Sequence, residues 1–152
     1  MAMETQVKEI TWDTCKKIWV HHLWKGRKDI SSMSSMASAT ETDMEIYKKY
    51  FPYFFGAYVD GKLAGVNSGH KTSETNFRSR GLYVLEEYRR LNVSTDILQH
   101  TIDTARDMGC TMCWTLPRET ALPAYEKVGF VKMSEWFPTD TSESNCYAEV
   151  QL

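Results

Sequence analysis

The sequence lacks a long apolar run: no stretch of its 152 residues approaches the roughly 18 consecutive apolar residues that a membrane-spanning helix needs. Its polar start, MAMETQVKE, has no apolar region of the kind found in a secretory signal peptide. It also lacks an excess of charge, since 18 basic and 20 acidic residues leave a formal net charge of -2. We therefore expect neither a membrane partner nor a nucleic-acid partner, and we expect a cytoplasmic location.

Cysteine is sparse, and two of the four cysteines form the motif C-T-M-C. A zinc site would need a second pair of ligands at a suitable spacing, and a thioredoxin-like motif begins a helix, whereas this motif lies in an alternating strand pattern. No metal site and no redox motif are therefore expected. We predict that the thiols of Cys15, Cys110, Cys113 and Cys146 are buried and reduced.

Internal repeats are also lacking, and no segment has the composition of a linker between domains. A chain of this length with 42% hydrophobic residues is able to bury one core of ordinary size. We therefore expect a single domain over residues 1–152.

The first third of the chain predicts one strand and two helices. The strand covers residues 7–10 and stops at Thr11, a typical N-cap for a helix that Gly26 ends. The small polar side chains of residues 31–42 favour a loop. A capping box at the end of this loop predicts a second helix over residues 43–50.

The rest of the chain alternates strands with helices. The dipeptide Asp60-Gly61 lies between two apolar runs and predicts a tight hairpin. The predicted elements are strands over 54–59, 62–70 and 77–84, a helix ended by Gly109, a strand over 110–116, a short helix capped by Thr120 and ended by Gly129, and strands over 130–137 and 146–152. The order β-α-α-β-β-β-α-β-α-β-β predicts an α/β domain with a mixed sheet of about seven strands and about four helices.

Two stretches carry a resemblance to a known family: LYVLEEYRRLNVS (82–94) and ALPAYEKVGF (121–130). Over residues 53–131 the chain resembles the Gcn5-related N-acetyltransferase (GNAT) superfamily. In that family a strand ending L-Y-V follows a hairpin, a turn of the form R-x-x-G-x-G/A opens a helix, and A-x-x-x-Y-E-K-x-G-F comes later. The resemblance implies a GNAT fold that transfers the acetyl group of acetyl-CoA to an amine through a tetrahedral intermediate, without a metal ion.

The turn in this family holds the diphosphate of coenzyme A, because the unpaired N–H groups and the dipole at a helix start favour negative charge. Arg89 stands at the leading position of the turn, and Asn92 and Ser94 replace its two small residues. Asparagine tolerates a positive φ, so Asn92 is able to form the turn. A solvated basic helix start is the alternative reading of this stretch. The resemblance assigns cofactor binding to Leu82, Tyr83, Val84, Arg89, Arg90, Leu91, Asn92, Val93, Ser94, Thr95, Arg118 and Tyr125.

The same resemblance implies two catalytic groups. Tyr125 stands at the position of the general acid that protonates the departing thiolate, with a merely packed tyrosine as the alternative. The backbone N–H of Val84 is expected to bond the acetyl carbonyl, on a strand that Gly81 allows to bulge. The glutamate that serves many relatives as a base is missing, since Arg78 and Arg80 occupy that part of the strand.

The missing carboxylate leaves the general base open. His70, expected at the end of the hairpin's second strand, and His22, expected on the apolar face of the first helix, are the candidates, because the pKa of a histidine suits the task, and Glu74 is a third. For each histidine a structural role is the alternative. A second function also stays open, in which a GNAT-fold module binds acyl-CoA or a protein partner without turnover. The amine acceptor and the formation of a homodimer are not determined by these motifs.

Overall fold

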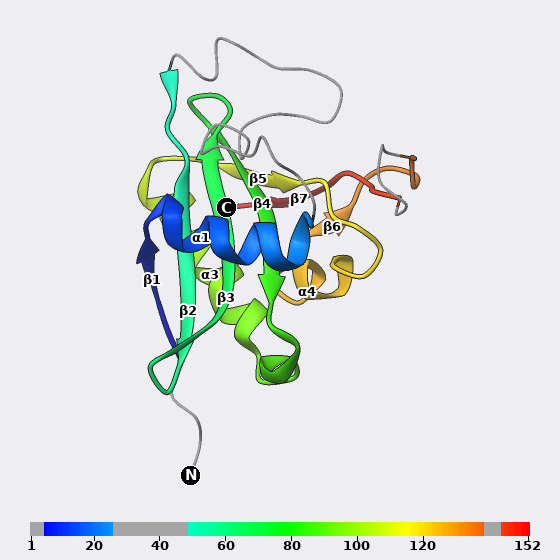
Figure 1. Ribbon diagram of the computed structural model, residues 1–152. Coiled ribbons are helices and arrows are strands. Elements are labelled where there is room, and N and C mark those ends of the chain that lie inside the picture. Colours follow the sequence, from blue (N-terminus) through cyan, green and yellow to red (C-terminus); the bar gives the residue numbers. More distant parts are fainter. Residues whose placement is uncertain (1–4, 26–48, 139–143) are drawn as a thin grey trace.

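The computed structural model describes residues 5–25, 49–138 and 144–152. Its centre is a seven-stranded sheet in the order β1-β2-β3-β4-β5-β7-β6 (Figure 1). The strands are β1 (Thr5–Ile10), β2 (Tyr53–Val59), β3 (Lys62–Lys71), β4 (Asn76–Val84), β5 (Met112–Thr115), β6 (Val131–Lys132) and β7 (Ala148–Gln151). Only β4 and β5 pair in parallel among these neighbours, so the predicted mixed α/β sheet is confirmed.

Helices cover both faces of this sheet. One face carries α1 (Trp12–Ile18) and the π-helical turn η1 (Trp19–Leu23), and the other carries α3 (Val93–Asp107) and the short α4 (Leu122–Glu126) (Figure 1). The predicted second helix, the loop that precedes it and Gly26 fall almost wholly outside the described residues. None of the helices in the described part of the chain is long and apolar enough to cross a membrane.

The sheet separates two apolar cores, because neighbouring residues of a strand point to opposite faces. Phe54 packs with Trp19 beneath α1, whereas Phe55 belongs to the core beneath α3. The fully buried Trp19 also donates its indole Nε1–H to the backbone oxygen of Gly81 at 2.9 Å. The first helix is therefore fixed directly to the middle strand β4.

All four cysteines are buried and carry free thiols, as predicted. Burial raises the pKa of Cys113 to about 12, so this thiol stays protonated at neutral pH. No group of three or more His, Cys, Asp or Glu side chains placed to hold a metal ion occurs among the described residues.

The predicted starts of the first helix and of the hairpin are confirmed. Thr11 caps α1, since its hydroxyl accepts the N–H of Thr14 at 3.2 Å. Asp60 and Gly61 have φ values of 48° and 82°, and two successive positive φ angles are what a two-residue type I′ hairpin requires.

Two predicted boundaries were wrong. The short helix begins at Leu122 with Ala121 as its N-cap and without a side-chain cap, because the chain already turns on the carbonyl of Arg118; Thr120 is not the cap. Pro123 falls in the first turn, where its missing N–H costs little. The strand predicted over 130–137 is reduced to Val131–Lys132, because the Ser134 hydroxyl takes the N–H of Tyr147 and so interrupts the backbone ladder.

Candidate active site

Strand β4 bulges just before its end. Its pairing with β3 jumps from Ser68–Arg80 to Val66–Tyr83, so two residues of β4 face one residue of β3. The bulge lies at Gly81, whose φ of 76° is strained for residues with a side chain but not for glycine. The bulge that was expected at this glycine is therefore present.

The end of β4 directs backbone groups away from β3. The N–H of Leu85 donates to the oxygen of Ala64 at 2.8 Å, which makes the facing residues Gly65 and Val84 a non-hydrogen-bonded pair. The N–H and C=O of Val84 therefore point to the other side of the strand. On that side the described pairing of β4 with β5 covers only residues 76–78, so Val84 faces a wedge between the two strands.

A tight turn joins the end of β4 to the start of α3. Asn92 precedes the helix in the left-handed conformation, with φ 61° and ψ 21°, as its substitution for glycine predicts. Arg90 also has a positive φ of 73°. The first helical bond runs from the N–H of Asp96 to the oxygen of Asn92 at 3.0 Å, so the N–H groups just before Asp96 have no partner within the helix.

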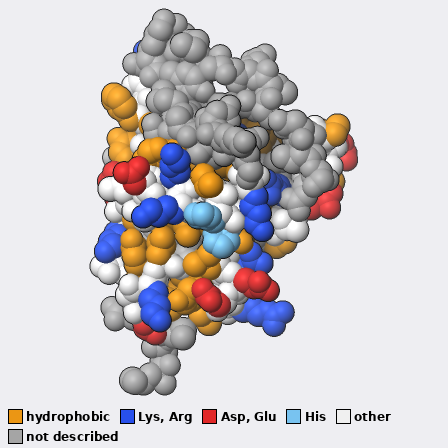
Figure 2. Space-filling view, in the orientation of Figure 1, with side chains coloured by type: hydrophobic (Ala, Val, Ile, Leu, Met, Phe, Trp, Pro, Cys, Tyr) orange, Lys and Arg blue, Asp and Glu red, His pale blue; other side chains and the backbone are white. Residues whose placement is uncertain are grey.

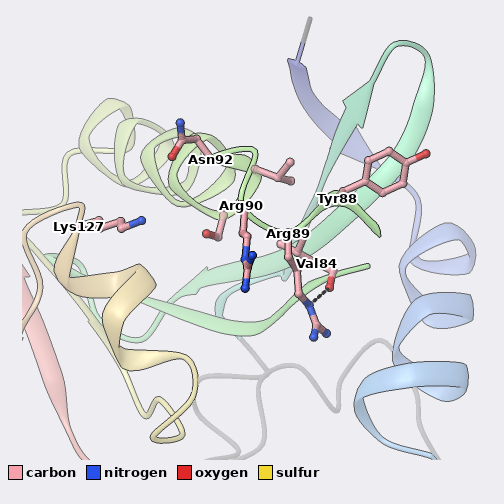
Figure 3. A pocket seen from close by; sticks show the side chains of 8 residues that line it. Val84, Tyr88, Arg89, Arg90, Asn92 and Lys127 are labelled. Atoms are coloured by element: carbon pink, nitrogen blue, oxygen red, sulfur yellow. Dashed lines mark hydrogen bonds between the residues drawn. The ribbon is translucent and has the colours of Figure 1, made fainter. Parts of the chain in front are cut away.

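A pocket of about 100 Å³ opens at this turn (Figure 3). It is lined by Val84, Tyr88, Arg89, Arg90, Asn92, Val93, Ser94 and Lys127. All of these except Tyr88 and Lys127 are residues to which the family resemblance assigns cofactor binding. Lys127 follows α4 and its side chain is directed toward the turn (Figure 3). Its signal in the sequence is the lysine of the YEKVGF motif.

The two arginines of the turn have different contacts. Arg89 folds back and donates its Nε–H to the oxygen of Val84 at 3.0 Å (Figure 3). Its guanidinium carbon lies 5.4 Å from the ring centroid of Tyr83. It thereby fixes the turn to the end of β4. Arg90 and Lys127 supply positive charge beside the start of α3, where the helix dipole already favours an anion.

Tyr125 lies in the core beneath α3 and is 2% exposed. Its hydroxyl oxygen is 2.9 Å from the hydroxyl oxygen of Ser79 on β4. Burial raises the pKa of Tyr125, and the hydroxyl groups of Ser79 and Thr115 act in the opposite direction. The phenol therefore carries its proton at neutral pH, which is the state that a general acid needs.

The candidate bases lie apart from one another. His70 is fully buried opposite Arg78, on the face of the sheet that carries α1, and its Nδ1 is 3.0 Å from the oxygen of Lys71. His22 is exposed, not on the apolar face of its helix as predicted, and its ring stacks on Tyr83 with 5.3 Å between centroids. Figure 2 shows histidine side chains on this face among Lys and Arg. Glu74 is exposed in the connection between β3 and β4.

The remaining residues assigned to the cofactor are not among those that line the pocket. Leu82 and Tyr83 are partly buried on β4, Thr95 is partly buried in the first turn of α3, and Leu91 is 38% exposed. Arg118 precedes α4, and its backbone forms a bridge with Asn145.

The bulged strand, the turn rich in positive φ angles and the buried tyrosine together are typical of one class of acyltransferase fold. The model of the acetyltransferase (GNAT) family matches residues 15–130, so the chain belongs to this family. A sequence search among curated proteins found no match. The GNAT family uses acetyl-CoA as its acyl donor, and acyl transfer is therefore the general activity of the class.

Solved structures with the same fold are similar over nearly the whole chain. Ard1 from Thermoplasma volcanium is 17% identical with a TM-score of 0.70, covering 100% of this chain and 99% of that one. IAA acetyltransferase from Bacillus cereus is 15% identical with a TM-score of 0.69, covering 98% and 100%. The ribosomal-protein-S18-alanine N-acetyltransferase from Escherichia coli is 17% identical with a TM-score of 0.66, covering 97% and 94%. At these identities the similarity concerns the fold.

Proposed function

We propose that the protein is an N-acetyltransferase, which moves the acetyl group of acetyl-CoA to an amine by direct attack. The observation that carries the proposal is the position of the α3 start beside the end of β4. Unpaired amides, Arg90 and Lys127 suit a diphosphate there, and the N–H of Val84 faces the adjoining wedge. A pantetheine arm that runs from the turn along β4 would bring a thioester carbonyl to this N–H.

The reaction balances with the groups available. A neutral amine attacks the carbonyl carbon of the thioester, and the negative oxygen that forms accepts the N–H of Val84. When the C–S bond breaks, its electron pair goes to sulfur, and sulfur takes the proton of Tyr125. The new amide nitrogen loses a proton, and Tyr125 regains one through solvent. The products are an N-acetylated amine and the free thiol of coenzyme A.

His22 is the better placed of the two candidate histidines. Its ring is exposed and stacks on Tyr83, the residue next to Val84, so it is able to pass a proton to solvent beside the proposed reaction centre. His70 is enclosed on the far face of the sheet from Tyr125, where an acceptor amine would have to displace packed side chains to reach it.

The test of the proposal is a pair of measurements on the full chain. Calorimetry with acetyl-CoA reports binding, and thiol release with a panel of amines reports turnover. The panel should include a peptide with a free N-terminal amine as well as small amines and polyamines, because the similar structures include both protein and other acetyltransferases. Binding without thiol release for any amine would favour a module that binds acyl-CoA or a protein partner. Absence of both would reject the proposal.

Replacing Arg90 and Lys127 together with alanine is expected to weaken coenzyme A binding by roughly tenfold per cation, because each would form a charge-assisted bond to phosphate. The loss should shrink as salt is raised, since partly exposed charges are screened. Calorimetry at two salt concentrations measures both effects.

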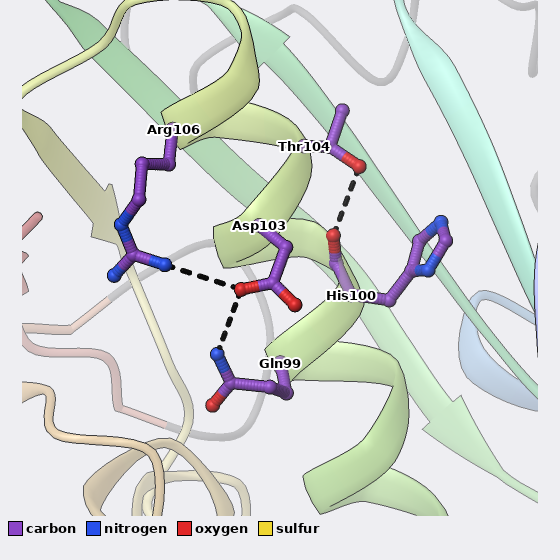
Figure 4. A network of polar contacts seen from close by, with 5 residues as sticks. All are labelled: Gln99, His100, Asp103, Thr104 and Arg106. Carbon is purple, nitrogen blue, oxygen red and sulfur yellow. Dashed lines mark hydrogen bonds and ion pairs between the residues drawn. The ribbon is translucent and has the colours of Figure 1, made fainter.

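The matched control is Arg106→Ala. Arg106 is exposed on α3 and bonds Asp103 at 3.2 Å (Figure 4), so its loss removes one cation without touching the pocket. Equal weakening in this control would show that only net charge matters. Unchanged affinity in the double variant would place the diphosphate elsewhere.

A further inference from the structure

We propose that Asn67 and Ser79 form a one-way chain of hydrogen-bond donors that directs the hydroxyl hydrogen of Tyr125 toward the leaving group. Both would then be positioning residues for the acid. The catalytic part of this inference depends on the proposed function, whereas the direction of the chain depends only on geometry.

The chain is built where four elements meet in the core. Asn67 comes from β3, Ser79 from β4, Thr101 from α3 and Tyr125 from α4, and each is at most 2% exposed. Buried hydroxyl and amide groups are costly unless they are bonded, so each must use its donors and acceptors on the others.

Thr101 fixes the orientation of the Asn67 amide. The hydroxyl of Thr101 donates its one hydrogen to the backbone oxygen of Ile97 at 2.9 Å, so its oxygen is able only to accept from a further group. Its contact with Asn67 at 2.9 Å must therefore be to the amide nitrogen Nδ2. The second hydrogen on this nitrogen is directed to the hydroxyl oxygen of Ser79 at 3.0 Å.

Ser79 in turn donates its hydrogen to Tyr125. Its own hydrogen has two acceptors within reach, the Tyr125 oxygen at 2.9 Å and Asn67 Oδ1 at 3.2 Å. The Asn67 amide already donates an N–H to the Ser79 oxygen, and it is unable to direct its own oxygen at the same atom with good alignment. The hydrogen of Ser79 therefore favours the shorter bond to Tyr125. Thr115 lies near enough for its hydroxyl to lower the pKa of Tyr125, but beside the neutral phenol its hydrogen goes to the backbone oxygen of Ser79 at 2.9 Å, which leaves Ser79 as the donor to the phenol.

A phenol oxygen that accepts from Ser79 has its own hydrogen free to point away from Ser79. When that proton moves to the departing sulfur, the phenolate left in the core keeps the Ser79 bond, which becomes charge-assisted and stronger. A bond that strengthens in the charged form lowers the pKa of Tyr125, in agreement with the effect of the Ser79 hydroxyl against burial. Ser79 therefore makes a deeply buried phenol a usable acid.

The decisive experiment titrates residue 125 directly. Tyr125 is replaced by 3,5-difluorotyrosine, a more acidic phenol, and its ionisation is followed by fluorine NMR in the otherwise native chain and with Ser79→Ala. The midpoint should rise by about 1 to 2 pH units in the alanine variant, the size expected for losing one hydrogen bond to a charged group. An unchanged or lowered midpoint would overturn the proposal.

Two further variants serve as a control and as a substitute for Ser79→Ala. Thr104→Val is the matched control, because Thr104 bonds the oxygen of His100 at 2.9 Å just as Thr101 bonds Ile97, but it lies outside the chain (Figure 4). In this variant the titration midpoint of residue 125 should stay unchanged. If Ser79→Ala fails to fold, Thr101→Val releases the Asn67 amide, and a smaller upward shift supports the proposal while none rejects it.

Turnover separates positioning from mere structure. Ser79→Ala should lower kcat by about tenfold with little change in KM for acetyl-CoA, and should lower it no further when Tyr125 is already phenylalanine. An equal loss in both backgrounds would mean that Ser79 acts only through packing. The titration needs no amine, so it tests the hydrogen-bond chain independently of turnover. If the titration midpoint shifts as expected but the protein releases no thiol with any amine, the proposed function is rejected and the direction of the hydrogen bonds stands.

Discussion

Replacing Tyr125 with phenylalanine is expected to lower turnover about 10²-fold while affinity for acetyl-CoA stays nearly unchanged. Only one oxygen atom is removed, and burial keeps this phenol protonated, so under the proposed function it is the group that would protonate a departing thiolate. Turnover is measured by thiol release and affinity by calorimetry, so that a loss of rate is not mistaken for a loss of binding.

Tyr147→Phe is the matched control for this substitution. Its hydroxyl also donates one hydrogen bond, to Glu149 at 2.8 Å. This pair lies on β7 and just before it in the sequence, away from Ser79. Turnover should be unaffected there. Because a buried group that loses its partner costs about 1 kcal/mol or more, both variants need an unfolding curve. Turnover of Tyr125→Phe within about threefold of the native rate would assign the tyrosine a structural role.

Gly81→Ala is expected to lower the free energy of unfolding by about 2 to 5 kcal/mol. Two effects add. The backbone at Gly81 has a φ of 76°, and an added Cβ would lie 2.3 Å from Cζ2 of Trp19. That indole ring is fully buried between Trp12, Trp24 and Phe54, so it has little room to move aside. Denaturant unfolding measures the loss.

Gly61→Ala separates these two effects. Gly61 has a similar φ of 82°, but nothing lies within 4 Å of an added Cβ. Its loss should be only about 1 to 2 kcal/mol, the cost of the left-handed backbone alone. Equal losses in the two variants would show that Trp19 adapts and that the bulge is not held by this contact.

The parts of the fold that follow local rules were predictable. A hairpin needs only two residues with positive φ, which Asp60-Gly61 supplies, and Asn92 replaces glycine at the start of α3 for the same reason. The turn before α3 likewise follows from consecutive residues, because its conformation is set within one short segment, whereas diphosphate binding there stays a prediction.

Features that depend on distant partners were not predictable. Lys127 reaches the pocket only because α4 packs beside α3, and Ser134 shortens β6 by bonding a residue of another strand. His22 was expected on the apolar face by a period of 3.6 residues. The helix widens at Trp19 into a π-turn, with Trp24 N–H bonding the Trp19 oxygen at 2.7 Å, so this period fails just before His22.

The wedge beside Val84 also bears on how the sheet avoids unwanted association. The outer strand β1 presents exposed Gln6, Lys8 and Glu9, and the opposite outer strand β6 is only two residues long, so both rims are poor templates for a strand of another molecule. Inside the sheet, the described pairing of β4 with β5 ends at residue 78, and the carbonyls of Ser79, Gly81 and Val84 beyond it already accept hydrogen bonds from side chains. The only interruption of the β4–β5 ladder in the described residues is therefore enclosed between two strands of the same sheet, while its rims resist aggregation.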